Sequence, residues 1–120
     1  MQFSIEKIDH VQLAAPKGSE QQAREFYDGI LGMKEIEKPE PLKARGGAWF
    51  EFGSIQLHIG IEEPFVSAKK AHPAFKVSGF EALKEHLSEK GVEFKNDDSI
   101  PGVERFFVFD PFGNRLEFLK

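Results

Sequence analysis

The chain has 120 residues, 40% of them hydrophobic and 30% charged, and its formal net charge is −4. A chain of this length can bury roughly two thirds of its unfolded surface, so we expect a single domain, residues 1–120, with its own core. Mixed charges argue against a nucleic-acid surface, and no apolar run approaches the ~18 residues of a membrane helix. The expected partners are therefore small molecules, and the cytoplasm is the default location because no secretory signal is readable.

The first half of the chain predicts a strand, a helix and three further strands. Apolar and polar residues alternate over residues 5–14, with His10 and Gln12 on the same side. A helix is expected between Ser19, a good N-cap, and Gly32, because apolar residues recur there at helical spacing. The remaining predicted segments are a strand at 33–37, a loop at 39–47 and strands at 48–52 and 55–60.

The second half repeats this order. Residues 63–70 show little periodicity and are interpreted as a linker between two modules, residues 1–62 and 71–120. The predicted elements of the second module are a strand at 72–77, a helix at 80–90 and strands at 92–94, 103–109 and 115–119. Neither module could easily bury its sheet face alone.

Each module carries a potential metal ligand at the same two places. His10 corresponds to His72 and His58 to Glu117, and the spacings within the pairs are 48 and 45 residues. This small difference falls in loops, where length changes are tolerated. With no cysteine in the chain, imidazole and carboxylate groups must hold any metal. We therefore expect the four side chains to converge on one cation.

Two simpler interpretations of these residues remain as alternatives to a shared metal site. Single strand histidines are more often packed or surface groups than ligands, and four histidines in 120 residues is an ordinary number. A site with four protein ligands could also be closed and structural, as in many zinc sites, whereas a site that keeps water would permit chemistry.

Three sequence segments of the chain resemble motifs of the vicinal oxygen chelate superfamily. This superfamily includes glyoxalase I, fosfomycin-resistance thiol transferases, bleomycin-binding proteins and extradiol dioxygenases. The segments are Ile8-Asp9-His10-Val11, Phe26-Tyr27-Asp28-Gly29-Ile30-Leu31-Gly32-Met33 and Asp110-Pro111-Phe112-Gly113-Asn114-Arg115-Leu116-Glu117. The resemblance implies an α+β fold in which two βαβββ modules form a half-open, mostly antiparallel barrel around a divalent metal. In many members the modules pair between two subunits, so the resemblance also implies a homodimer with the site at the subunit interface.

The resemblance places the metal ligands at His10, His72 and Glu117. His58 falls where glyoxalase I has a carboxylate ligand, so it departs from the family pattern and is expected as a fourth ligand by its position. Such a donor set suits Zn²⁺, Ni²⁺, Co²⁺, Mn²⁺ or Fe²⁺, and affinity order alone cannot choose among them.

The resemblance further implies a lyase or isomerase of the glyoxalase type. In this hypothesis the metal acts as a Lewis acid on a substrate with adjacent oxygens, and Glu117 moves a proton as the catalytic residue. Three alternatives stay open: a thiol transferase of the fosfomycin-resistance type, an extradiol dioxygenase, and a metal-free drug-binding module. The transferase is disfavoured because the chain has no C-terminal extension to close the pocket. The dioxygenase is disfavoured because no additional histidine base can be assigned, and the drug-binding module because the ligands are retained.

Five further side chains are expected to line the substrate pocket. They share the predicted concave faces with the ligands, and an aromatic wall with few polar groups suits a small molecule. The five are Gln12, Trp49, Gln56, Arg105 and Phe107. Arg105 could clamp a carboxylate or phosphonate, although an unassigned Arg is more often a solvated rim residue. A place in the core is an equal alternative for Trp49 and Phe107.

Overall fold

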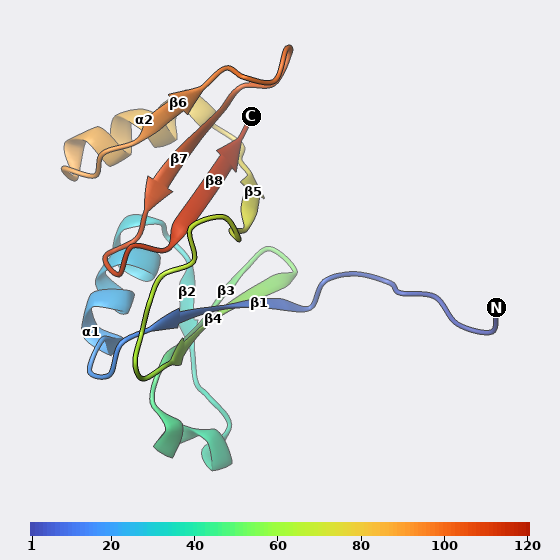
Figure 1. Cartoon of the computed structure of the whole chain (residues 1–120), viewed down its shortest axis with the longest axis vertical. Helices are drawn as coiled ribbons and strands as arrows, with labels where there is room; N and C mark the ends of the chain where they lie inside the picture. The colour runs from blue at the N-terminus through green and yellow to red at the C-terminus, as the bar shows by residue number, and fades with distance from the viewer. The chain divides into compact units, whose positions relative to one another are not determined.

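A computed structural model describes all 120 residues of the chain (Figure 1). The residues divide into two compact units, Met1–Glu63 and Pro64–Lys120. Each unit has one four-stranded sheet, with short helical segments in the first unit and one helix in the second. No helix in either unit has the length and apolar character needed to cross a bilayer.

The first unit contains a mixed sheet and a broken helix. Its sheet has the strand order β1-β4-β3-β2, in which β1 runs parallel to β4 and the other neighbours are antiparallel. In chain order the elements are β1 (His10–Ala15), α1 (Glu20–Ala23), the π-helical segment η1 (Arg24–Ile30), β2 (Lys34–Ile36), the 3₁₀ segment η2 (Glu40–Arg45), β3 (Ala48–Phe52) and β4 (Ile55–Ile61). Because side chains alternate along a strand, one face of this sheet forms the core and the other stays open.

The core of the first unit lies between the sheet and the helical segments. Phe50 and Leu57 are fully buried, and Ile59 nearly so, on the face opposite to His58. From the helical side, Tyr27 is fully buried and its ring lies 5.6 Å from that of Phe50. Burial of these large apolar groups stabilises the packing of the helical segments on this face, and the opposite face of the sheet carries His58.

The second unit has the same strand order. Its sheet runs β5-β8-β7-β6, with β5 parallel to β8 and the other neighbours antiparallel. The elements are β5 (Ala74–Lys76), α2 (Phe80–Glu89), β6 (Lys95–Asp97), β7 (Arg105–Phe109) and β8 (Arg115–Leu119). The predicted α+β class with two βαβββ modules is therefore confirmed, and neither sheet closes on itself.

Aromatic rings build the core of the second unit. Phe106 is fully buried, and the rings of Phe80, Phe94 and Phe118 lie 5.2, 5.2 and 5.3 Å from its ring. Leu87 of α2 is also fully buried. The same alternation that turns Phe106 towards this core turns its neighbour Phe107 to the open face of the sheet.

Equivalent residues occupy equivalent register positions in the two sheets. His58 pairs with Gln12 across the parallel strands β4 and β1, and Glu117 pairs with Ala74 across β8 and β5. His10 precedes Gln12 by two residues, as His72 precedes Ala74. The correspondence expected between the two pairs of ligands is therefore present in the register of each sheet.

Several element boundaries differ from the predicted ones because strand pairing decides them. Strand β1 begins at His10 rather than at residue 5, since the pairing with β4 begins at His10 and Gln56. The strand expected at 92–94 lies instead at Lys95–Asp97, because Phe94 packs on Phe106 while the next three residues pair with β7.

Two local features of the predicted helix and strand also need correction. Ser19 precedes α1 but makes no side-chain capping hydrogen bond. Strand β5 begins at Ala74, so His72 lies just before it and not within it. Pro73, which has no backbone N–H, accepts a hydrogen bond from Glu117 N through its carbonyl oxygen at 3.1 Å.

Candidate metal centre

The open face of the first sheet carries the polar and aromatic residues of interest. Strand alternation puts His10 and Gln12 of β1 on this face, and the register aligns them with Gln56 and His58 of β4. Trp49 of β3 pairs with His58 and so shares the face. Two of the four predicted ligands, together with three predicted substrate contacts, therefore lie side by side.

His10 has one ring nitrogen engaged and one free. Its Nδ1 lies 3.0 Å from Asp9 Oδ2, and its side chain is 45% exposed. The hydrogen bond to Asp9 also lowers the pKa of that carboxyl below its usual value. Metal-binding histidines commonly donate one ring N–H to a carboxylate, which orients the ring and leaves the other nitrogen for the metal. His10 Nε2 therefore suits a metal ligand.

His58 is held between two rings. It is 4% exposed, and its ring stacks on Trp49 at 3.8 Å and on His10 at 4.2 Å. Its Nε2 lies 2.8 Å from Gln56 Oε1, so Nε2–H donates to that amide oxygen and Nδ1 carries the lone pair. Burial, and then the nearby His10, lower the pKa of His58. A metal could use His58 through Nδ1, or through Nε2 if Gln56 moves.

The lowered pKa of His58 predicts a loss of stability in acid. The unfolded chain binds a proton near the ordinary pKa of 6.5, whereas folded His58 binds it only at lower pH. Stability from neutral His58 is therefore fully present above about pH 6.5 and is lost as pH falls towards the lowered pKa, by at most about 1.4 kcal/mol per pH unit. Urea unfolding across this range should show a smaller acid loss for His58→Gln than for the native protein. Equal losses would contradict the assignment.

The second unit brings His72 and Glu117 together. His72 Nε2 lies 2.8 Å from Glu117 Oε1, and His72 Nδ1 lies 2.7 Å from the carbonyl oxygen of Lys70. Nδ1–H therefore donates to the carbonyl oxygen of Lys70, which leaves Nε2 facing the carboxylate. A ring nitrogen and a carboxylate oxygen at this separation need a proton or a cation between them.

A divalent cation fits this pair. Two ligand atoms at about 2.1 Å from a six-coordinate ion lie about 3 Å apart, close to the observed separation. Glu117 is 6% exposed, so its carboxylate is costly to bury without a cationic or hydrogen-bonding partner. The donor set of imidazole and carboxylate also matches the chemistry of Zn²⁺ and its neighbours in the first transition series.

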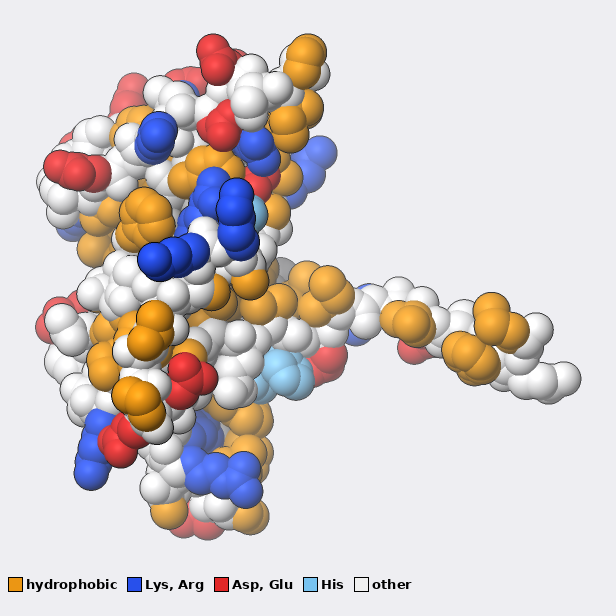
Figure 2. Space-filling view, in the orientation of Figure 1, with side chains coloured by type: hydrophobic (Ala, Val, Ile, Leu, Met, Phe, Trp, Pro, Cys, Tyr) orange, Lys and Arg blue, Asp and Glu red, His pale blue; other side chains and the backbone are white.

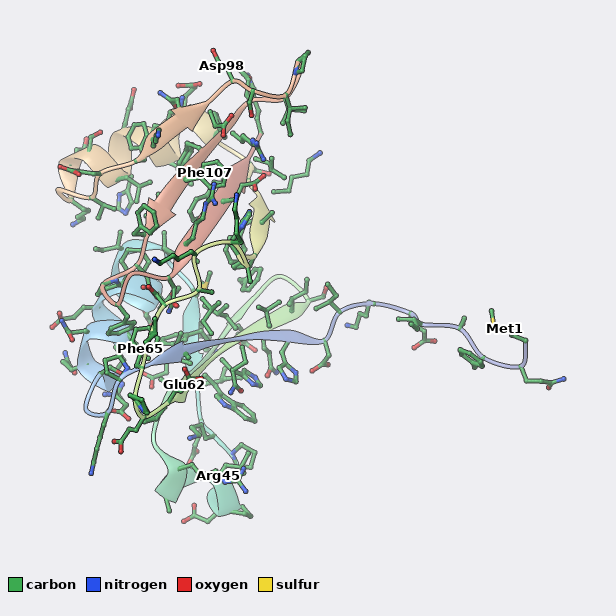
Figure 3. The ribbon with its side chains drawn as sticks, in the orientation of Figure 1. Met1, Arg45, Glu62, Phe65, Asp98 and Phe107 are labelled. Atoms are coloured by element: carbon green, nitrogen blue, oxygen red, sulfur yellow. The ribbon has the colours of Figure 1, made fainter.

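The guanidinium groups of Arg105 and Arg115 lie 5.1 and 4.0 Å from the ring centroid of Phe107. Figure 3 labels Phe107 on the sheet of the second unit. Arg105 Nη1 is 3.4 Å from Glu117 Oε1 and its Nη2 is 3.4 Å from Asp97 Oδ2, so two carboxylates already balance this guanidinium. Arg105 is therefore neither a solvated rim residue nor a free anion clamp.

Arg115 is the residue that sequence reasoning missed. Its guanidinium lies 4.0 Å from the Phe107 ring centroid, and it makes no ion pair in the structure. Strand alternation was the available signal, since Arg115 precedes Glu117 by two residues and so shares its face. A guanidinium held on an aromatic ring and without an acidic partner can bind an anionic group.

The remaining predicted contacts occupy the open faces as well. The Gln12 amide lies over Gly60, where any larger side chain would overlap it. Gln12 and Trp49 border a cavity of about 280 Å³ in the first unit, together with Lys38 and Arg45. Cavities of roughly this size and above hold small ligands. Phe107 is 7% exposed and its ring meets His72 edge-on at 5.6 Å.

The four predicted ligands therefore form two pairs, one within each unit. No group of three or more His, Asp or Glu side chains able to hold a metal gathers in the structure. Convergence of both pairs on a single cation stays a prediction.

Comparison with known proteins identifies the family. Residues 7–118 match the model of the Glyoxalase/Bleomycin resistance protein/Dioxygenase superfamily. The chain belongs to this superfamily. The match covers both units, including all four predicted ligands.

Solved and curated relatives agree with this membership. A glyoxalase family protein from Bacillus anthracis is 52% identical, with a TM-score of 0.96 over 99% of this chain and 98% of that one. A glyoxalase family protein from Enterococcus faecalis is 30% identical, with a TM-score of 0.77 over 95% and 97% of the two chains. Glyoxylase I 4 of Arabidopsis thaliana is 24% identical over 94% of this chain and 70% of its own length.

Proposed function

We propose that the protein is a metal-dependent enzyme of the glyoxalase type, a lyase or isomerase that acts on a small substrate with adjacent oxygens. The observation that carries the proposal is the contact of 2.8 Å between His72 Nε2 and Glu117 Oε1. Because Lys70 engages Nδ1 of His72, the contact between Nε2 and the carboxylate needs a proton or a cation, and a divalent cation would fit the spacing.

The first unit offers a second pair of donors. His10 presents a free Nε2, oriented by Asp9, and His58 presents Nδ1 while Gln56 holds its other nitrogen. Ligands of a metal are usually oriented by such neighbouring groups. We propose His10, His72 and Glu117 as metal ligands and His58 as a fourth donor, with both pairs serving the same cation.

The chemistry divides between the metal and the side chains. A bound divalent ion would act as a Lewis acid and stabilise negative charge on the substrate oxygens. Glu117 is the group that would take a proton from the carbon next to a carbonyl, if it can leave the metal during turnover, since it is a buried carboxylate. Arg105 Nη1 and His72 Nε2 both contact Glu117 Oε1, at 3.4 and 2.8 Å, and so position its carboxylate.

The open faces supply the substrate contacts. Trp49 and Phe107 would provide apolar surface and Gln12 and Gln56 amides, and Gln12 and Trp49 also border the cavity of about 280 Å³ in the first unit. The Arg115 guanidinium favours a substrate with an anionic group.

Metal content tests the proposal directly. Protein purified without chelator should hold about one divalent ion per chain, measured by elemental analysis, and His10→Ala should lower this content at least about tenfold. His86→Ala is the matched control, because it removes the fourth histidine, which lies on α2 outside the proposed ligand set. A native protein that binds no divalent metal, even after incubation with Zn²⁺, Ni²⁺, Co²⁺, Mn²⁺ and Fe²⁺, would overturn the proposal.

A further inference from the structure

The cavity of about 280 Å³ in the first unit is lined by the η2 segment and by residues of β1, β3 and β4. Leu42, Trp49 and Ile61 give it apolar walls, and two of its lining residues, Lys38 and Arg45, are cationic. None of the lining residues is acidic. A cavity with apolar walls and only positive charge suits a small organic anion.

The two cations of this cavity are not neutralised by carboxylates. No salt bridge of the first unit includes Lys38 or Arg45. The Nζ of Lys38 donates a hydrogen bond to the carbonyl oxygen of Gly46, which leaves two of its three N–H groups for another acceptor. Arg45 is exposed at the end of η2 (Figure 3), and Figure 2 shows Lys and Arg side chains gathered over this segment.

The backbone fixes the shape of the cavity. Gly47 N donates to Glu20 Oε2 at 2.7 Å, which ties the residues after η2 to the helix α1 and engages that carboxylate. Gly47 has a φ of +86°, and a Cβ there would lie 2.1 Å from the carbonyl oxygen of Ile59, so only glycine lets the chain lie this close to β4. At Gly60 the missing side chain leaves room for the Gln12 amide, which a Cβ would meet at 2.4 Å.

The cavity adjoins the candidate metal centre through two shared side chains. Trp49 lines the cavity, and its ring stacks on that of His58 at 3.8 Å. Gln12 also lines the cavity and pairs with His58 in the register of β1 and β4. A ligand with its anionic group at Lys38 and Arg45 would therefore extend along Trp49 towards His58.

We infer that this cavity binds a small carboxylic acid with an apolar body, whose carboxylate is held by Lys38 and Arg45. Hydrogen bonds between ionised partners are stronger than neutral ones, and a guanidinium can contact both carboxylate oxygens. The apolar body would lie against Leu42 and Trp49, and it must be short because the cavity is at the small end of ligand pockets. The inference rests on the proposed function only in taking this acid as the substrate class, since its binding requires no metal.

Two probes of equal size test the inference on metal-free protein from which the chelator has been removed. Trp49 is the only tryptophan of the chain, so its fluorescence reports binding in the cavity. Titration should give at least about tenfold tighter binding of hexanoate than of hexanamide, which has the same apolar body but no charge. Arg45→Gln and Lys38→Gln should each reduce this preference at least about threefold and leave the affinity for hexanamide unchanged.

Lys43→Gln is the matched control. It removes the same charge from η2, but Lys43 pairs with Glu37 and Glu40 and does not line the cavity. The preference for hexanoate should stay within about twofold of the native value, since exposed pairs contribute little.

Four outcomes would overturn the inference. They are no binding of hexanoate at about 10 mM, equal affinities for the two probes, a preference that Arg45→Gln or Lys38→Gln leaves intact, and equal weakening of both probes in these variants. The last outcome would mean that the two side chains shape the cavity without holding a carboxylate. None of these outcomes depends on metal content, which tests the proposed function separately.

Discussion

Glu117→Gln should reduce the affinity for a divalent metal at least about 100-fold and any turnover by about 10²–10⁴-fold. The amide keeps the size of the side chain but removes the negative charge that faces His72 Nε2 at 2.8 Å. It also removes the group that we propose as the acceptor of the substrate proton. Calorimetric titration with Zn²⁺ or Ni²⁺ measures the first effect without knowledge of the substrate.

Glu104→Gln is the control for this prediction. Glu104 carries the same charge in the same unit, but it is 59% exposed and pairs with Lys120 at 3.0 Å. Its loss should leave metal affinity unchanged within about twofold, since exposed pairs contribute little. Equal metal affinity in the Glu117 and Glu104 variants would remove Glu117 from the proposed ligand set.

Phe106→Ala should lower the free energy of unfolding by about 3–5 kcal/mol. Phe106 is fully buried and lies against Phe80, Phe94 and Phe118, so its removal leaves a cavity in the core of the second unit. Urea denaturation followed by circular dichroism measures the change.

Phe109→Ala tests whether burial causes that loss. Phe109 lies on the same strand β7 but is 63% exposed. Its truncation should change the free energy of unfolding by no more than about 0.5 kcal/mol. Similar losses in the two variants would show that the core is not packed around Phe106 as described.

Much of the fold follows from local patterns in the sequence. Strands β3 and β8 lie at the predicted residues 48–52 and 115–119, because alternating apolar residues are bounded there by turn-forming residues such as Gly53 and Gly113. The repeat of strand, helix and three strands predicted two modules of one layout, and the two sheets share one strand order. Local alternation and turn chemistry carry this information.

Boundaries set by distant partners were not predictable in this way. The start of β1 depends on where β4 begins, and the place of β6 depends on Phe94 filling the core beside Phe106. A short apolar run does not by itself distinguish a strand from a core-filling loop.

The candidate site, like the fold, has features that the sequence predicted and features that depend on the folded geometry. The sequence repeat predicted that His72 and Glu117 are joint ligands; their side chains lie 2.8 Å apart, and their role as metal ligands stays a prediction. The backbone oxygen of Lys70 on His72, and Gln56 on His58, depend on side-chain and loop geometry that no spacing reveals. Arg115 was missed although alternation along β8 placed it beside Glu117.

Anomalous diffraction from crystals of the zinc-loaded protein tests most directly whether both pairs of donors serve one cation. We predict one strong peak per chain, about 2.0–2.2 Å from Nε2 of His10, Nε2 of His72 and a carboxylate oxygen of Glu117, with each ligand supplied by the same chain or by a second copy. A peak held by only one of the two pairs, or no peak at Glu117, would contradict the account.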